Sequence, residues 1–261
     1  MNNQPIGIFD SGIGGLSVLS KINVILPSED LIYIGDTAYL PYGTKDKKII
    51  TERSHKICRY LIGEKCKSIV VACNTATSAA VNELRTSFTV PIIGIEPAIK
   101  PATQHTQSGV IGVLATEATL EGNKLSDLKQ KFGQDITILH QSCFGLVEEI
   151  ELGTHQNLAL QGLIETYVKP LIEGGADTIV LGCTHFPLIK DLIQKYAGDD
   201  ITVLDPSLSV ASELKRQLNR KNLIRQMGLG ETTYFQTGDS KAFINFIRKS
   251  SSKCTSSRLE I

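Results

Sequence analysis

The chain has 261 residues, of which 41% are hydrophobic and 21% are charged. This composition is that of a globular protein, long enough for one α/β domain or for two domains of ordinary size. Lys+Arg and Asp+Glu balance at 27 each, and no apolar run approaches the ~18 residues of a membrane-spanning helix, so neither a nucleic acid nor a membrane is an expected partner.

Short apolar runs alternate along the chain with longer segments of helical pattern. The predicted strands cover residues 6–10, 31–36, 68–73, 91–96, 109–116, 135–143, 177–183 and 200–206. The predicted helices cover residues 45–64, 75–87, 120–132, 155–173 and 186–197, and helical segments continue from about residue 207 to about residue 248. Continuous Ile, Val and Leu runs are typical of strands buried on both faces. The alternation predicts an α/β fold with mainly parallel sheets flanked by helices.

Two segments 110 residues apart share one pattern. Residues 68–85, SIVVACNTATSAAVNELR, parallel residues 178–195, TIVLGCTHFPLIKDLIQK. Each contains a buried strand, a small residue, Cys, a polar pair and an amphipathic helix. A fainter similarity links residues 6–12 with residues 111–117. A duplicated α/β unit explains both similarities.

The duplication predicts two similar lobes. We expect the first lobe to contain residues 1–95 and 207–261 and the second to contain residues 96–206. The segment from residue 207 lies outside both copies and is expected to pack on the first lobe. We expect a pseudo-twofold relation between the lobes and an active site in the interlobe cleft.

Cys73 and Cys183 occupy matching positions in the two copies. Ligands of open α/β sheets bind beyond the carboxyl ends of the strands, and a helix start there favours a thiolate. A lone cysteine at a strand end is usually a core residue. Two at matching positions, both followed by polar residues, favour a functional pair. Thiols on opposite faces of one carbon suit a stereoinverting proton transfer, in which one thiolate removes a proton and the other thiol delivers one.

The other cysteines are expected to be structural. Cys58 and Cys66 fall on a helical segment and its end, and Cys143 ends a strand. No CxxC pair occurs, and the start of the chain lacks a secretory signal, so we expect a cytoplasmic protein with free thiols. Cys183 and His185 stand two residues apart without a second nearby pair, so no metal is expected.

Four motifs in order over residues 7–188, namely GIFDSGIGGLSV, YIGDTAYLPYG, VACNTATS and LGCTHFPL, resemble the signatures of the glutamate racemases. These enzymes belong to the cofactor-independent aspartate/glutamate racemase superfamily. The resemblance implies two α/β lobes with the active site between them. It also implies interconversion of L- and D-glutamate without a cofactor, for bacterial peptidoglycan synthesis. It implies that Cys73 takes the α-proton of D-glutamate and Cys183 that of L-glutamate, and it suggests a homodimer.

Asp10 and Ser11 end the first predicted strand and open a glycine-rich stretch, DSGIGG. An Asp at the carboxyl end of a strand, at the edge of the sheet where ligands bind, could orient the substrate ammonium or assist a nearby thiol. An N-cap with a tight turn is the structural alternative. A phosphate loop is the other, but the glycines follow neither G-x-G-x-x-G nor GxxxxGK[ST].

Further substrate contacts are expected at three places. Tyr42 and Gly43 form a local turn, and only the resemblance makes them substrate contacts. Asn74, Thr75 and Thr184 follow the two thiols and are natural carboxylate binders, because hydroxyls and helix-start N–H groups favour anions. Thr77 is a weaker candidate of the same kind.

His185 and Glu151 are candidates for assisting the thiols. His185 stands two residues after Cys183, where it would promote a thiolate or hold the ammonium, although a helix cap is the alternative. Glu151 matches an acidic position of the family, but Glu148 and Glu149 compete for that assignment and the segment also fits a solvated helix face.

Other functions remain open at the level of sequence. Another racemase of the superfamily, acting on aspartate or a hydantoin, would carry similar motifs. A non-catalytic amino-acid-binding protein on the same fold and a thiol peroxidase are the remaining alternatives, and the retention of both thiols argues against the former.

Overall fold

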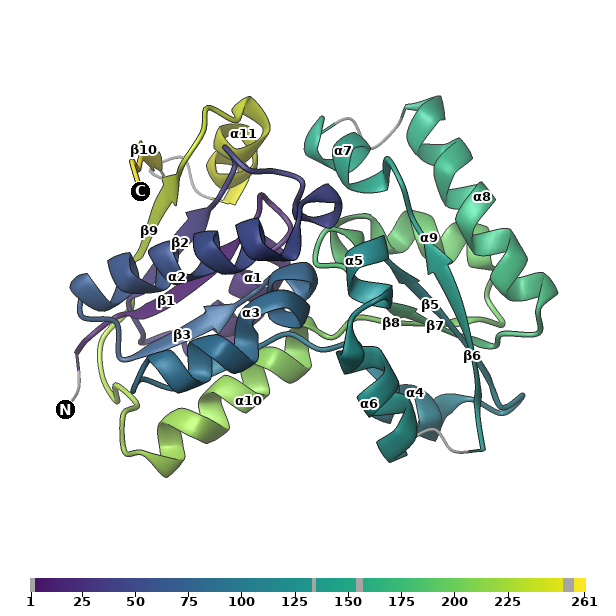
Figure 1. Cartoon of the computed structure of the whole chain (residues 1–261), viewed down its shortest axis with the longest axis horizontal. Coiled ribbons are helices and arrows are strands. Elements are labelled where there is room, and N and C mark those ends of the chain that lie inside the picture. The colour runs from purple at the N-terminus through teal and green to yellow at the C-terminus, as the bar shows by residue number, and fades with distance from the viewer. Residues whose placement is uncertain (1–2, 133–134, 154–156, 251–255) are drawn as a thin grey trace. The chain divides into compact units, whose positions relative to one another are not determined.

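Each of the two units of the chain is built on one parallel β-sheet flanked by helices (Figure 1), which confirms the α/β class. The computed structural model describes residues 3–132, 135–153, 157–250 and 256–261. The first unit contains Met1–Ile95 and Ser207–Ile261, and the second contains Glu96–Pro206.

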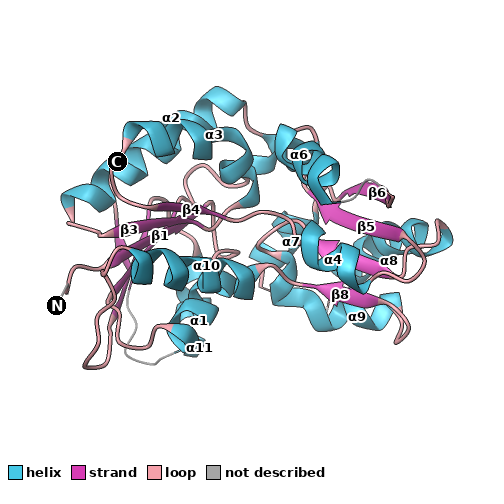
Figure 2. Ribbon diagram, turned by 90° about the horizontal axis from the view of Figure 1, so that it is seen from below, coloured by secondary structure: helices cyan, strands magenta, loops and turns pink. Residues whose placement is uncertain are grey.

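The sheet of the first unit has the strand order β10-β9-β2-β1-β3-β4. Its strands are β1 (Ile6–Asp10), β2 (Leu31–Gly35), β3 (Ser68–Val71), β4 (Ile92–Gly94), β9 (Thr232–Gln236) and β10 (Ser256–Arg258). Its helices are α1 (Leu16–Ile25), the 3₁₀ helix η1 (Tyr42–Thr44), α2 (Lys47–Gly63), α3 (Asn74–Ser87), α10 (Ser207–Arg220) and α11 (Lys241–Ser250). Helices α2 and α3 cover one face of the sheet, and α1, α10 and α11 cover the other (Figure 2).

The sheet of the second unit has the order β6-β5-β7-β8. Its strands are β5 (Val110–Ala115), β6 (Thr137–Ser142), β7 (Thr178–Leu181) and β8 (Thr202–Leu204). Its helices are α4 (Ile99–His105), α5 (Glu117–Leu120), α6 (Asn123–Phe132), α7 (Leu146–Glu151), α8 (Leu158–Glu173), the 3₁₀ helix η2 (Phe186–Ile189) and α9 (Lys190–Ala197). Helix α8 packs on β5 and β6, and α4 packs on β7.

The second sheet repeats the order of four neighbouring strands of the first, since β2-β1-β3-β4 corresponds to β6-β5-β7-β8. A pair of glycines extends the correspondence. A Cβ atom at Gly7 on β1 would lie 2.8 Å from a methyl group of Leu61 on α2, and one at Gly112 on β5 would lie 2.7 Å from a methyl group of Leu171 on α8. In both units glycine therefore makes room for a leucine of the covering helix.

Side-chain caps explain where two long helices begin. The carboxylate of Asp46 accepts the N–H of Lys48 at 2.7 Å at the start of α2. The carboxamide of Asn157 accepts the N–H of Leu160 at 2.6 Å at the start of α8. Each bond satisfies one of the main-chain donors that a helix start leaves unpaired.

The part of the chain after α10 differs from the helical continuation that the sequence pattern predicts. Residues Thr232–Gln236 form β9, which pairs in parallel with β2, and β10 pairs with β9. Tyr234 faces Tyr33, with ring centroids 6.3 Å apart. The short run TTYFQ contains the β-branched and aromatic residues that suit a strand, and the existing edge of β2 supplies its hydrogen-bond partners.

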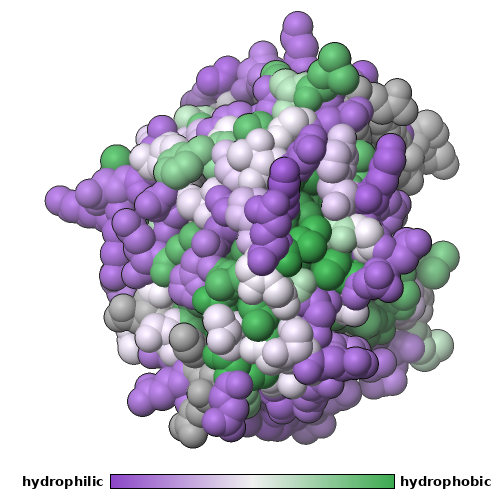
Figure 3. All heavy atoms as spheres, turned by 90° about the vertical axis from the view of Figure 1, so that its right-hand side faces the viewer, coloured by the Kyte–Doolittle hydropathy of each residue, from purple (hydrophilic) through white to green (hydrophobic). Residues whose placement is uncertain are grey.

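The surface drawn in Figure 3 is mostly polar, with smaller apolar areas between the charged side chains. The large apolar side chains that are exposed include Phe144, Leu152 and Leu158. Among the residues that the structure describes, no helix has both the length and the apolar character needed to cross a membrane.

Candidate active site

Asp10 lies at the carboxyl end of β1 and is fully buried. Its carboxylate accepts the N–H of Gly12 at 2.9 Å, and the hydroxyl of Tyr33 donates to the carbonyl of Gly12 at 2.8 Å. A Cβ atom at Gly15 would lie 2.7 Å from the Cβ of Asp10, so glycine lets this loop pack against the strand end. Ser11 is buried beside it. The loop is therefore held firmly at the edge of the sheet where ligands of parallel sheets bind.

Cys73 follows β3 and caps helix α3. Its Sγ accepts the N–H of Ala76 at 3.4 Å, and the residue is 5% exposed. Negative charge on this sulfur would be stabilised by that N–H and by the positive end of the helix. Cys73 is therefore held at the start of α3 with its sulfur against a main-chain donor of the first turn.

Asn74 is buried immediately after this thiol, and both polar atoms of its carboxamide lack a hydrogen-bond partner within the described part of the chain. Buried polar groups are nearly always bonded, so an open carboxamide at this rim indicates a polar ligand. Thr75 is buried next to it.

Thr77 behaves differently from its neighbours. Its hydroxyl donates to the carbonyl of Val71 at 3.2 Å and accepts the N–H of Ile95 at 3.2 Å. These bonds tie the ends of two adjacent strands together. The structure therefore gives the Thr77 hydroxyl two structural hydrogen bonds, and its expected substrate contact stays a prediction.

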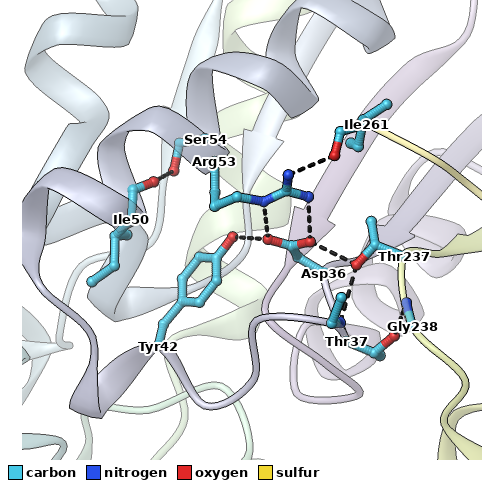
Figure 4. Close-up of polar contacts among 10 residues, drawn as sticks. Asp36, Thr37, Tyr42, Ile50, Arg53, Ser54, Thr237, Gly238 and Ile261 are labelled. Carbon is cyan, nitrogen blue, oxygen red and sulfur yellow. Dashed lines mark hydrogen bonds and ion pairs between the residues drawn. The ribbon is translucent and has the colours of Figure 1, made fainter.

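Tyr42 is buried on η1, with Gly43 partly buried beside it. Its hydroxyl donates to Asp36 at 2.5 Å, so the phenol anchors the turn to the end of β2 (Figure 4). The turn expected from the PYG triplet is a short 3₁₀ helix. Asp36 and its partner Arg53 were not anticipated from the sequence, although an Asp closing a predicted strand was an available signal.

In the second unit, Cys183, His185 and Glu151 form a chain of contacts. The Sγ of Cys183 lies 3.8 Å from Nδ1 of His185, and Nε2 of His185 lies 2.6 Å from Oε1 of Glu151. All three are buried. Glu148 is exposed and Glu149 accepts a bond from Asn157, so the structure assigns the acidic partner to Glu151.

The surroundings of His185 hold its pKa well above 6.5. Burial lowers the pKa of His185, but the hydrogen bonds to Cys183 and Glu151 and their negative charges outweigh that effect. The protonated ring provides a positive charge beside Cys183. Thr184, between the two, is buried at the same strand end.

The remaining described cysteines are buried free thiols of another kind. Burial raises the pKa of Cys58 and of Cys66 to about 12, and it raises the pKa of Cys143 further. A thiol that stays protonated in an apolar environment is a packing residue. Cys254 lies outside the described residues.

The known proteins that this chain resembles in sequence are racemases. A family model described as Asp/Glu/Hydantoin racemase matches residues 6–214. The chain is 44% identical over 239 residues to a glutamate racemase of Ectopseudomonas mendocina, covering 91% of each protein. It is 43% identical over 241 residues to one of Methylococcus capsulatus, covering 92% of this chain and 89% of that protein.

Solved structures share the fold at lower identity. A glutamate racemase of Bacillus anthracis matches with a TM-score of 0.92 at 28% identity, over 100% of this chain and 99% of that one. One from Francisella tularensis in complex with D-glutamate has a TM-score of 0.86 at 28% identity, over 100% and 98%. The Escherichia coli glutamate racemase, in complex with L-glutamate and an activator, has a TM-score of 0.84 at 28% identity, over 97% of each chain. The chain belongs to the Asp/Glu/hydantoin racemase family.

Proposed function

We propose that this chain is a glutamate racemase, an isomerase that interconverts L- and D-glutamate without a cofactor. The curated relatives carry that name, and two of the similar solved structures contain D-glutamate or L-glutamate. The observation that carries the proposal is the repeated rim: an inner strand of each sheet is followed by a buried thiol, Cys73 or Cys183, with polar side chains directly after it.

The reaction needs two bases that exchange roles. With L-glutamate, the thiolate of Cys183 removes the α-proton and becomes a thiol, and the electron pair remains on the substrate as a carbanion-like species. The thiol of Cys73 then delivers its proton to the opposite face of the α-carbon and becomes the thiolate. D-Glutamate follows the same path in reverse. The proposal requires both thiols to reach one α-carbon.

Polar groups at the rims fit the rest of the substrate. The α-proton of an amino acid is weakly acidic, so the transition state needs oriented hydrogen-bond donors. The open carboxamide of Asn74 and the hydroxyls of Thr75, Thr184 and Ser11 supply donors for the carboxylates. Asp10 is suited to the ammonium. These contacts are part of the proposal, as are those of Tyr42 and Gly43.

The two thiols would be assisted in different ways. Protonated His185, held by Glu151, stabilises negative charge on Cys183, whereas Cys73 relies on the N–H of Ala76 and the start of α3. We therefore assign His185 to assist Cys183 and Glu151 to orient His185.

The product has a defined use in this proposal. D-Glutamate would be supplied in the cytoplasm for bacterial peptidoglycan, and we expect the enzyme to act as a homodimer. Light scattering at several protein concentrations tests the dimer, and a single mass equal to one chain would contradict it.

Isotope exchange in D₂O tests the reaction and its two-base character together. The wild-type protein is incubated with each enantiomer of glutamate, and α-deuterium is followed in substrate and product. Two bases on opposite faces should place deuterium in the product first, with little in the remaining substrate. Cys73→Ser and Cys183→Ser should each lower kcat by about 10²–10⁴-fold, the usual contribution of a positioned acid or base.

Cys66→Ala is the control, because Cys66 precedes β3, at the opposite end of that strand from Cys73, and is a packing thiol. It should retain near-normal turnover. Exchange with aspartate or a hydantoin but not with glutamate would overturn the substrate assignment. Glutamate binding without any turnover in the wild type would identify a non-catalytic binding protein.

A further inference from the structure

The carboxylate of Asp36, directly after β2, is surrounded by hydrogen-bond donors (Figure 4). Oδ2 accepts the hydroxyl of Tyr42 at 2.5 Å and Nε of Arg53 at 3.0 Å. Oδ1 accepts Nη2 of Arg53 at 2.7 Å and the hydroxyl of Thr237 at 2.7 Å. Asp36 is fully buried and Arg53 is 3% exposed. The ion pair is therefore bidentate, desolvated and fully hydrogen-bonded on the acidic side.

Arg53 is itself fixed from two further directions. Its Nη1 donates to the main-chain oxygen of Ile261 at 2.6 Å. Its guanidinium lies 4.1 Å from the ring centroid of Tyr39. Helix α2 therefore meets the segment after β10 through one side chain, and these contacts leave the guanidinium a single orientation.

Tyr42 connects this ion pair to the rim that carries Cys73. Its side chain belongs to the same buried cluster as Cys73. Burial and the negative charge of Asp36 raise the pKa of Tyr42, so the phenol keeps its proton and acts as the donor to Asp36. Because this hydroxyl is committed to Asp36, its function is to hold the turn at Tyr42–Thr44 in place.

We propose that Arg53 is a positioning residue for the substrate turn: it orients Asp36, which holds Tyr42 and with it the turn that contacts glutamate. The inference rests on the proposed function, in which Tyr42 and Gly43 are substrate contacts. Arg53 touches no reacting atom, so its contribution acts on substrate binding more than on proton transfer.

Arginine is required here because of its geometry. A guanidinium presents parallel N–H donors to both oxygens of a carboxylate and has a further N–H for Ile261, whereas a lysine ammonium is a single point charge. Arg53→Lys therefore keeps the positive charge and loses the paired N–H donors that bind both oxygens of Asp36. Tyr42→Phe removes the link to the turn and leaves Asp36 with three of its four bonds.

The experiment is a double-mutant cycle on KM and kcat for glutamate, with the full-length chain. Arg53→Lys and Tyr42→Phe should each raise KM by about threefold to tenfold, the factor expected for one lost hydrogen bond, with kcat changed much less. The double variant should show no larger rise than Tyr42→Phe alone, since Arg53 acts through Tyr42. Arg53→Gln should raise KM more than Arg53→Lys does.

Lys67→Arg is the matched control. Lys67 forms another deeply buried ion pair of this unit, with Glu29, at the opposite end of the strands. It should lower the unfolding temperature without changing KM. An unchanged KM in Arg53→Lys with a similar loss of stability would reduce Arg53 to a structural role. A KM effect that persists undiminished in the Tyr42→Phe background would overturn the route through Tyr42.

A second readout separates this inference from the proposed function. The alkylation rate of Cys73 by iodoacetamide, followed by mass spectrometry, reports the packing beside Tyr42 without any turnover. Arg53→Lys should change that rate and Lys67→Arg should not. Inactive wild-type protein would overturn the racemase proposal alone, whereas an unchanged alkylation rate in Arg53→Lys would overturn the positioning role.

Discussion

Individual residues at the two rims differ in the support they receive. His185 and Glu151 are buried beside Cys183, whereas Cys73 lies beside a main-chain N–H and the carboxamide of Asn74, which has no hydrogen-bond partner among the described residues. Cys183 lies beside a fully charged ring and Cys73 beside the partial positive charge of a helix start, so the two sulfurs have unequal surroundings. In the proposed mechanism, the two directions of racemisation should therefore respond differently to pH and to substitution.

His185 should make the stability of the protein depend on pH. The folded pKa of His185 is raised, so its contribution is fully present below its unfolded pKa of 6.5 and is lost as pH rises through the folded value. In that window the free energy of unfolding should fall by up to about 1.4 kcal/mol per pH unit. Glu151→Gln removes one cause of the raised pKa, so the fall should end at a lower pH. Urea unfolding from about pH 6 to about pH 9 measures this, and identical profiles would contradict the coupling.

The buried carboxamide of Asn74 should lower the stability of the protein without a ligand. A buried carboxamide without partners is unfavourable until a ligand binds, so Asn74→Ala should raise the free energy of unfolding of the free protein by about 1 kcal/mol. The same change should raise KM for glutamate. Denaturant titration and steady-state kinetics check the two effects, and a variant that loses both stability and affinity would indicate that Asn74 is a packing residue.

Much of the candidate site was visible in the sequence, because thiols, hydroxyls and glycines at strand ends are local signals. The contact between His185 and Glu151 joins residues 34 positions apart, and only the fold shows it. Arg53 was missed because an arginine on a helical segment ordinarily faces water. The hydroxyl direction of Tyr42 depends on Asp36 and is equally invisible.

At the scale of elements, uninterrupted apolar runs located the inner strands well, since both faces of those strands are covered. The sequence pattern did not predict β9, because this strand depends on pairing with the edge of β2, some 200 residues earlier in the chain. The sequence pattern also did not predict α1 and α4. Helix α1 follows a glycine-rich loop, and α4 is short and contains a proline. Predicted strands extended past the true ends because rim residues such as Cys73 continue the apolar run.

Two glycines give a matched prediction for the elements of the second unit. Gly162 is exposed within α8, and a Cβ there would meet nothing within 4 Å, so Gly162→Ala should stabilise the protein by about 0.5–1 kcal/mol. Gly182 precedes Cys183, and a Cβ there would lie 2.9 Å from the carbonyl oxygen of Leu114. Gly182→Ala should therefore destabilise the unit and slow turnover. Thermal unfolding of both variants checks this, and equal effects would contradict the close approach at Gly182.

At the scale of the whole molecule, the chain forms two units with separate sheets and cores, and the sequence repeat finds its counterpart in their common strand order. The repeat was recognisable because the strand, thiol and helix recur together. The proposed chemistry uses one thiol from each unit, so ligand binding should involve both.

Ligand linkage tests this at the same scale. Either enantiomer of glutamate at 100 times its Kd should raise the free energy of unfolding by about 2.7 kcal/mol. Hydrogen exchange should slow at main-chain N–H groups near both Cys73 and Cys183, and aspartate at the same concentration should have a weaker effect. Protection restricted to one unit would contradict a substrate that both thiols reach.

The first unit consists of two segments separated by the whole second unit, and this order affects folding during synthesis. Residues 96–206 form a contiguous stretch, whereas the first unit receives β9 only after the whole second unit has been translated. Until Thr232–Gln236 leaves the ribosome, the outer edge of β2 exposes unpaired N–H and C=O groups, which invite pairing with other nascent chains. The second unit can fold first, whereas the sheet of the first unit stays incomplete at the edge of β2 until β9 has been synthesised.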